Sequence, residues 1–389
     1  MPHSLIAVLL SIITLLPAVG VKAEVTVGAA RTEAYLPLLK GKRVALLSNH
    51  TGMVGDEHTL DIMLANGVNV TTIFSPEHGF RGKADAGQHV ADGVDAKTGI
   101  PIASLYSGKN RMPAQSVMES IDVIVCDLQD VGTRFYTYYI TMLDLMRAAS
   151  LNGKEFIVLD RPNPNGMTVD GPVLDMKYKS GVGRLPIPVV HGMTLGELAM
   201  MIVGEGWLDT GKDLALHVVE CEGYTHSTRY KLPIAPSPNL PDMKAVYLYS
   251  STCYFEGTPI SLGRGTDMPF TVYGHPSMKG CKFSFTPRSR EGAKNPPQLG
   301  KLCHGVDLRS LSDEEIIAKG VNFEYVIDAY RRSGLGQKFF TNFFTLLTGT
   351  PTIRTMIEQG KTADEIRRSW KPDVDKFRAR RAPYLLYPE

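Results

Sequence analysis

Glu77, His78 and Arg81 are the residues of this chain that are best placed to do chemistry. They lie in the segment Ser75-Pro76-Glu77-His78-Gly79-Phe80-Arg81-Gly82, directly after the apolar, β-branched run 70–74, which predicts a buried strand. In an open α/β sheet, ligands bind beyond the carboxyl ends of the strands. A carboxylate, an imidazole and a guanidinium at such an end suit proton transfer and the binding of an anionic group. The alternative interpretation is a polar loop that caps the segment after it.

Polar residues also follow most of the other strands that the sequence predicts. The predicted strands are 44–48, 70–74, 103–106, 123–128, 156–159, 189–191 and 216–219. The residues after them include Asn49 and His50, Ser107, Asp127, Asp130 and Arg134, Asp160 and Arg161, and His191. All carboxyl ends of a parallel sheet lie on one edge. Six polar strand ends therefore predict a single active cleft at that edge.

The alternation of strands and helices predicts the fold class. Helices are predicted at 58–66, 115–120, 138–152 and 194–205, and Thr194 and Glu197 have the spacing of a capping box. Near-continuous apolar strands alternating with helices are typical of a mostly parallel sheet covered on both faces. We therefore expect a Rossmann-like, doubly wound α/β domain over residues 24–235. A proline-rich connection, 233–241, leads to a smaller α+β domain over 236–389, with helices at 324–332 and 363–370.

The N-terminal residues resemble a secretory signal. An apolar run, 5–19, precedes the small-residue site Val21-Lys22-Ala23, so we expect a signal peptide over residues 1–23. The mature protein would then be periplasmic or secreted, with no stable membrane span; a retained N-terminal anchor is the alternative. The five cysteines have no CxxC spacing, and the sequence does not choose a disulfide among Cys221, Cys253, Cys281 and Cys303.

Several classes of ligand are disfavoured. A formal net charge of +2 argues against a nucleic-acid-binding protein. No G-x-G-x-x-G motif follows the first strand and no P-loop motif is present, so we expect no nucleotide cofactor. A G-x-S-x-G elbow is absent, which argues against a serine hydrolase. No recognisable metal-ligand spacing is present, so we predict no metal and keep a metal-dependent hydrolase as a lesser alternative.

The remaining pattern fits glycoside hydrolysis, which needs a carboxylic acid and often a second carboxylate. Glu77 is the candidate acid, and Asp127 and Asp130 are candidates for the second group, although we expect one of the two to pair with Arg134. His78 and His191 are candidates for orienting Glu77 or binding substrate. The further candidates for substrate binding are Asn49, His50, Arg81, Arg134, Tyr136, Asp160, Arg161, Glu256 and Arg264. Of these, Glu256 and Arg264 would approach the cleft from the second domain.

Seven segments resemble one known family, the exo-β-N-acetylmuramidases of the NamZ type. They are SNHTG (48–52), SPEHGFRG (75–82), DLQDVGTRFYTY (127–138), LDRPNP (159–164), PVVHGMTLGELA (188–199), PSPNLP (236–241) and FEGT…GRGTDMPF (255–270). The resemblance implies release of terminal N-acetylmuramic acid from peptidoglycan fragments, with Glu77 as the catalytic residue. It leaves the second group open, because the substrate's 2-acetamido group can itself act as the nucleophile. A non-catalytic protein that binds cell-wall fragments is the competing interpretation.

Overall fold

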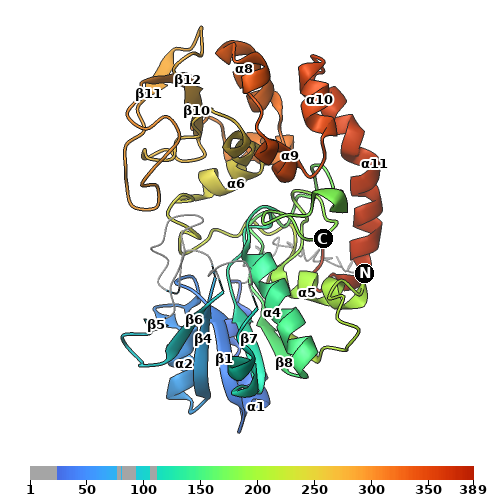
Figure 1. Cartoon of the computed structure of the whole chain (residues 1–389). Coiled ribbons are helices and arrows are strands. Elements are labelled where there is room, and N and C mark those ends of the chain that lie inside the picture. The colour runs from blue at the N-terminus through green and yellow to red at the C-terminus, as the bar shows by residue number, and fades with distance from the viewer. Residues whose placement is uncertain (1–23, 77–79, 81–92, 106–111) are drawn as a thin grey trace, which may run out of the picture.

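A seven-stranded, mostly parallel sheet forms the centre of the N-terminal part of the chain (Figure 1). The computed structural model describes residues 24–76, 80, 93–105 and 112–389. In spatial order the strands are β5 (Gly93–Val94), β6 (Pro101–Ser104), β4 (Asn69–Ser75), β1 (Arg43–Ser48), β7 (Val123–Asp127), β8 (Glu155–Leu159) and β9 (Leu216–Val219). Only β5 runs antiparallel to its neighbour. The six parallel strands follow the order 3-2-1-4-5-6 of the Rossmann fold, as the sequence predicts.

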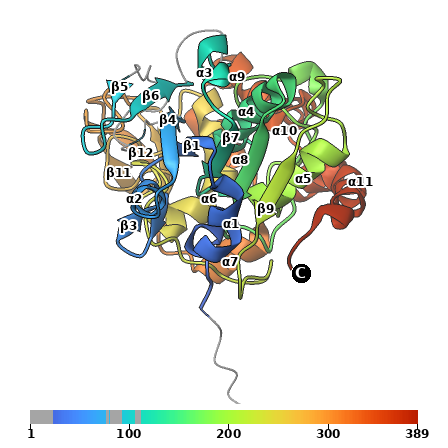
Figure 2. The same cartoon turned by 90° about the horizontal axis from the view of Figure 1, so that it is seen from below.

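Helices cover both faces of this sheet because its strands are apolar on both sides. Val44 and Leu46 of β1 pack with α1 (Thr32–Leu39) and α2 (Thr59–Ala65). Ala45 and Leu47 face the other way, toward α3 (Gln115–Glu119), α4 (Tyr138–Asn152) and α5 (Leu195–Gly204). Figure 2 shows α1 and α2 on one side of the sheet and α3 and α4 on the other. This confirms the doubly wound arrangement.

The second part of the chain combines helices with a small antiparallel sheet, which confirms the α+β prediction. Its strands lie in the order β10 (Val272–His275), β12 (Cys303–Asp307) and β11 (Phe283–Phe285). Its helices are α6 (Met243–Thr252), α7 (Asp313–Lys319), α8 (Glu324–Ser333), α9 (Asn342–Thr348), α10 (Thr352–Glu358) and α11 (Ala363–Arg381). One hydrophobic cluster runs through both parts, from Ala45 of β1 to Phe377 of α11.

Three local predictions are wrong. The predicted strand 189–191 forms only isolated bridges, from Val190 to Thr133 and Asp170. The predicted helix 363–370 continues as α11 to Arg381, through Pro372. The strand predicted at 103–106 is β6, which begins at Pro101 and ends at Ser104. The capping box predicted at Thr194 and Glu197 is present at the start of α5.

The end of the chain returns to the N-terminal part and is hydrogen-bonded to it. Tyr387 donates a hydrogen bond of 2.7 Å from its hydroxyl to Asp160, directly after β8. Leu386 donates its backbone N–H to Glu197 of α5, and Pro388 accepts from the N–H of His226. All five cysteines are free thiols, and no described helix is both long and apolar enough to cross a membrane. The predicted signal peptide, 1–23, lies outside the described residues.

Candidate active site

The carboxyl ends of β1 and β7 lie side by side at the centre of the sheet, where the strand order reverses. Leu47 of β1 lies opposite Phe74 of β4 on one side and Cys126 of β7 on the other, and Ser48 lies opposite Asp127. Ligands of Rossmann-like sheets bind at this reversal. The loops after β1 and β7 are therefore the framework of the candidate site.

Asn49 ties these two loops together and is fully buried. Its side-chain oxygen accepts hydrogen bonds from the backbone N–H of Thr51 (3.0 Å) and from the Thr51 hydroxyl (2.6 Å). Its amide group donates to the hydroxyl of Tyr138, at 2.8 Å. Thr51 in turn accepts from the N–H of Gln129, after β7. Both ends of the Asn49 side chain are engaged, so its role here is to position the loops.

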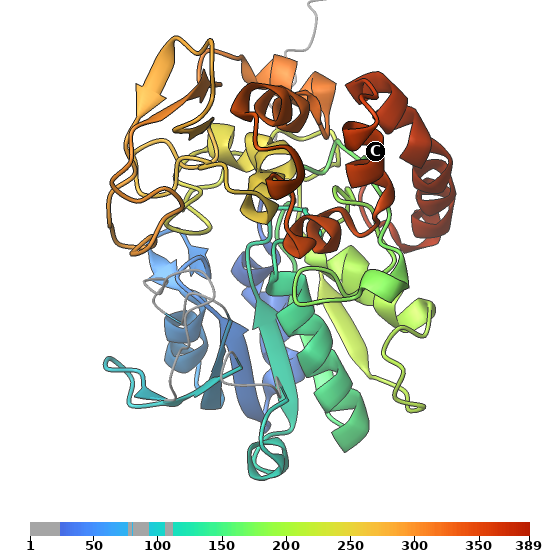
Figure 3. The same ribbon diagram turned by 45° about the horizontal axis from the view of Figure 1, so that its top comes forward.

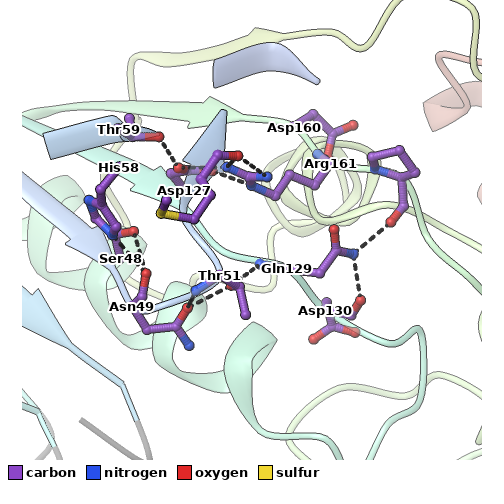
Figure 4. Close-up of polar contacts among 12 residues, drawn as sticks. Ser48, Asn49, Thr51, His58, Thr59, Asp127, Gln129, Asp130, Asp160 and Arg161 are labelled. Atoms are coloured by element: carbon purple, nitrogen blue, oxygen red, sulfur yellow. Dashed lines mark hydrogen bonds and ion pairs between the residues drawn. The ribbon is translucent and has the colours of Figure 1, made fainter. Parts of the chain in front are cut away.

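Asp127 forms a buried ion pair with Arg161 (Figure 4), and the expectation that one of Asp127 and Asp130 pairs with Arg134 is wrong. Arg161 donates from Nε to one carboxylate oxygen at 2.5 Å and from Nη2 to the other at 3.0 Å. The Thr59 hydroxyl donates to the same carboxylate at 2.6 Å. The side chains of Asp127 and Arg161 are 0% and 4% exposed. Because both groups are closed off from solvent and paired, this arrangement assigns Asp127 to structure rather than catalysis.

Asp130 is a different kind of carboxyl group. One oxygen accepts from the backbone N–H of Gly132 at 2.6 Å, whereas the other is buried and has no hydrogen-bond partner among the described residues. Burial raises its pKa to about 7, an effect that is opposed by nearby backbone N–H groups, including that of Tyr139 in the first turn of α4. Figure 4 shows Asp130 apart from the Asp127–Arg161 pair. A carboxyl group with a pKa near neutrality can both give and take a proton.

The proline-rich connection between the two parts of the chain lies against this site. Tyr136 donates from its hydroxyl to the carbonyl of Pro236 at 2.8 Å. His50 places Nε2 3.0 Å from the carbonyl oxygen of Ala235. Two predicted site residues therefore hold the connection in place.

Glu256 and Arg264 approach from the second part of the chain, as the sequence analysis expected. Arg264 donates from Nη2 and Nε to one Glu256 oxygen, at 2.6 and 3.1 Å. Its guanidinium lies 4.9 Å from the centre of the Phe270 ring. Edge-to-face contacts continue from Phe270 to Tyr249 and from Tyr249 to Tyr136. An aromatic cluster thus joins the Glu256–Arg264 pair to the loop after β7.

Arg134 is a structural residue, and the prediction that it binds substrate or pairs with an aspartate is wrong. Its side chain is fully buried, and its guanidinium donates to four carbonyl oxygens at 2.6–2.9 Å, those of Pro172, Ile187, Leu347 and Thr348. Burial lowers its pKa from the usual value. These four carbonyl groups belong to segments that are far apart in the chain. Arg134 therefore links the two parts of the chain.

Asp160 and His191 are also engaged in the fold. The Asp160 carboxylate accepts from the Thr194 hydroxyl (2.6 Å), the Gly196 N–H (2.8 Å) and the Tyr387 hydroxyl (2.7 Å), and burial raises its pKa to about 6. His191 accepts from the N–H of Met193, and burial lowers its pKa to about 3, so its imidazole is neutral. Within the described ranges, no hydrogen bond or ion pair joins His191 to Asp127 or Asp130. We therefore withdraw Asp160 as a substrate-binding candidate, whereas His191, whose Nε2 is buried without a hydrogen-bond partner among the described residues, stays a candidate.

His58 is a site residue that the sequence analysis missed. Its Nδ1 accepts from the Leu60 N–H at the start of α2, so Nε2 carries the proton and donates to the Asn49 carbonyl at 2.8 Å. The Phe80 ring lies edge-on to this imidazole, with centroids 5.1 Å apart. Phe80 belongs to the segment 75–82, but Glu77, His78 and Arg81 of that segment lie outside the described residues. His58 directly precedes an apolar run with helical spacing, and this position in the sequence indicates a helix N-cap.

Comparison with known proteins identifies relatives over nearly the whole chain. The family model described as "Exo-beta-N-acetylmuramidase NamZ, N-terminal" matches residues 44–244, and its C-terminal counterpart matches residues 247–387. The peptidoglycan beta-N-acetylmuramidase NamZ of Bacillus subtilis strain 168 is 38% identical over 374 residues, which cover 91% of this chain and 89% of that protein.

Two crystal structures of DUF1343 family proteins from Bacteroides fragilis NCTC 9343 share the fold. The first has a TM-score of 0.89 and 58% identity, and the match covers 94% of this chain and 100% of that one. The second has a TM-score of 0.76 and 31% identity, with 93% and 99% covered. In the part of the chain that the structure describes, no three His, Cys, Asp or Glu side chains are placed to hold a metal ion.

Proposed function

The chain belongs to the NamZ family of exo-β-N-acetylmuramidases, and from this premise we propose that it removes terminal N-acetylmuramic acid from the non-reducing ends of peptidoglycan fragments. It is a glycoside hydrolase. The observation that carries this function is the match of both family models, in order, over residues 44–387. The polar residues at the reversal between β1 and β7 supply a site of the kind that the reaction needs.

Glu77 is the proposed proton donor. Hydrolysis breaks the bond between the anomeric carbon of muramic acid and the glycosidic oxygen, and that oxygen must take up a proton as it leaves. Glu77 follows the carboxyl end of β4 by two residues, and β4 is the direct neighbour of β1 in the sheet. His78 is the proposed orienting group beside it.

Asp130 is the proposed second carboxyl group. Asp127 is committed to Arg161, whereas Asp130 keeps one oxygen without a partner among the described residues. That oxygen can accept a hydrogen bond from the attacking water or from the acetamido N–H of the substrate. With water as the nucleophile, Asp130 takes the proton that the water loses as it attacks the anomeric carbon. With the acetamido oxygen as the nucleophile, Asp130 stabilises the positive charge that this group acquires.

A cationic group is needed for the lactyl carboxylate that distinguishes muramic acid. With Arg134 buried against carbonyl oxygens, Arg264 and Arg81 remain as the proposed partners. Arg264 is held by Glu256 at 2.6 Å, which fixes the plane of its guanidinium. A planar, pre-oriented guanidinium suits bidentate binding of a carboxylate.

The enzyme is proposed to act outside the cytoplasm, after cleavage of a signal peptide over residues 1–23. The apolar run and small-residue site of that segment support this location. Expression of the full chain in a Gram-negative host, followed by fractionation and N-terminal sequencing, tests it. A mature N-terminus at Glu24 in the periplasmic fraction is expected; an uncleaved chain in the cytosol contradicts it.

The activity itself is tested with the disaccharide in which muramic acid is linked to N-acetylglucosamine. The proposal predicts release of both free sugars in equal amounts. A protein that only binds cell-wall fragments would retain the disaccharide intact through a long incubation. Muramic acid at an internal position of a longer glycan should not be released until it becomes the terminal sugar.

A further inference from the structure

The connection between β11 and β12, residues 286–302, is a long loop. It extends from the second part of the chain toward the seven-stranded sheet. We call it the β11–β12 loop. Figures 1 and 3 both show it in orange, over the side of the sheet formed by β4 and β6. The strand β4 leads directly into the segment with Glu77. The loop therefore lies over the strand after which the chain enters the segment with the proposed proton donor.

Hydrogen bonds attach this loop to the two segments that carry the site's second half. Arg288 donates its backbone N–H to the carbonyl of Gly265 at 2.9 Å, and Gly265 directly follows Arg264. Asn239, in the proline-rich connection, donates from its buried side chain to the carbonyl of Gly292 at 2.8 Å. The first attachment places the backbone of Arg288 next to Gly265, and the second holds the loop four residues further on.

The loop and its flanks carry a concentrated positive charge. Residues 279–301 contain six cationic residues and a single carboxylate, Glu291, in a chain whose net charge is only +2. Arg290 is neutralised by an ion pair with Asp267. Arg288 is exposed, and no carboxylate of the described residues pairs with it. An exposed guanidinium without a partner at the edge of a site attracts anionic ligands.

The proposed substrate supplies an anion at a defined place. In a peptidoglycan strand without stem peptides, muramic acid with a free lactyl carboxylate alternates with neutral N-acetylglucosamine, so a carboxylate recurs on every second sugar. When terminal muramic acid occupies the site, the next carboxylate lies on the third sugar, beyond the bond that is cleaved. We propose that Arg288 binds this second lactyl carboxylate and makes the enzyme prefer glycan strands of four or more sugars over the disaccharide. This inference rests on the proposed function.

The test compares kcat/KM for three substrates: the disaccharide, the alternating tetrasaccharide, and the same tetrasaccharide with the lactyl group of its third sugar converted to a carboxamide. The wild-type enzyme is expected to favour the charged tetrasaccharide by about three- to tenfold, as befits one solvent-exposed charged contact. Added salt should reduce this preference. The carboxamide should abolish it.

Three variants complete the design. Arg288→Ala should lose the preference for the charged tetrasaccharide, and Arg288→Lys, which keeps the charge, should retain part of it. Arg331→Ala removes an exposed cation of α8 and serves as the matched control, with the preference unchanged. Because the carboxamide and Arg288→Ala remove the same contact, combining them should cost no more than either alone.

Separate readouts distinguish the two levels of the proposal. Wild-type cleavage of the disaccharide reports on the proposed function, whereas the ratio between substrates reports on Arg288. An active enzyme with equal kcat/KM for all three substrates would overturn the Arg288 assignment. A preference that Arg288→Ala leaves intact would overturn it as well. Failure of the wild-type enzyme to cleave any of them would overturn the function and this inference together.

Discussion

Replacing Asp127 by Asn separates the structural account of this residue from a catalytic one. The substitution removes the negative charge of a buried ion pair and keeps the shape of the side chain. The structure predicts that the main consequence is lost stability. Arg161, whose side chain is 4% exposed, would keep its positive charge in the interior without a counter-charge.

The size of the effect follows from the contacts around the carboxylate. Arg161 and Thr59 direct three N–H and O–H donors at the two oxygens, at 2.5–3.0 Å. Asn offers a single oxygen, so its amide N–H group must face at least one of these donors. Removing one partner of a buried pair costs about 3–5 kcal/mol. We therefore expect Asp127→Asn to lower the free energy of unfolding by that amount.

Urea denaturation followed by fluorescence measures the change, and activity at low temperature shows whether the folded fraction still works. Asp122→Asn, which breaks the exposed pair with Arg43, is the matched control and should change stability far less. Adding Arg161→Met to Asp127→Asn should recover part of the loss, because the unpaired charge is gone. Wild-type stability together with abolished turnover would refute this reasoning and make Asp127 a catalytic group.

Three further predictions concern groups with other roles. Arg134→Met leaves four carbonyl oxygens without their donor and should cost about 3–5 kcal/mol in urea denaturation, whereas a loss under 1 kcal/mol would contradict its role in joining the two parts. Asp130 has a pKa raised to about 7, so the native state holds its proton more tightly than the unfolded chain. Wild type should therefore lose stability relative to Asp130→Asn as pH rises from about 4 to about 7, and parallel pH profiles would contradict this. Tyr387→Phe removes the hydroxyl that bonds Asp160 and Cys221 and should cost about 1–3 kcal/mol, while an unchanged melting temperature would show that the chain end contributes little.

Periodicity predicted most of the fold because local and tertiary preferences agree there. The helix α4 matches the predicted range 138–152, and Gly153 ends it in the left-handed conformation, with φ of 62°. The misjudged elements are those that tertiary contacts decide. Val190 forms single β-bridges to two separate segments and does not belong to a strand of the sheet. The apolar residues Val374 and Phe377 pack into the core, and this packing keeps α11 helical beyond Pro372.

The gathering of polar side chains at one edge of the sheet was predictable from the sequence, but the role of each side chain was not. Polar residues after apolar strands indicated that edge. The same pattern could not show which of these side chains form hydrogen bonds or ion pairs that stabilise the fold. Asp160, Arg134 and Arg161 bind partners that lie 34 to 227 residues away in the chain. Asp127 and Asp130 are three residues apart, yet one is paired and the other is not. Only the three-dimensional contacts separate them.

Protonation of the leaving oxygen by Glu77 can be measured by comparing substrates with different leaving groups in the Glu77→Gln variant. N-acetylglucosamine is a poor leaving group that needs the proton, whereas 4-nitrophenolate leaves without it. We expect a loss of about 10²- to 10⁴-fold in kcat/KM on the disaccharide and a much smaller loss on the 4-nitrophenyl muramic acid glycoside. Near wild-type turnover of the disaccharide by a folded Glu77→Gln enzyme would contradict it.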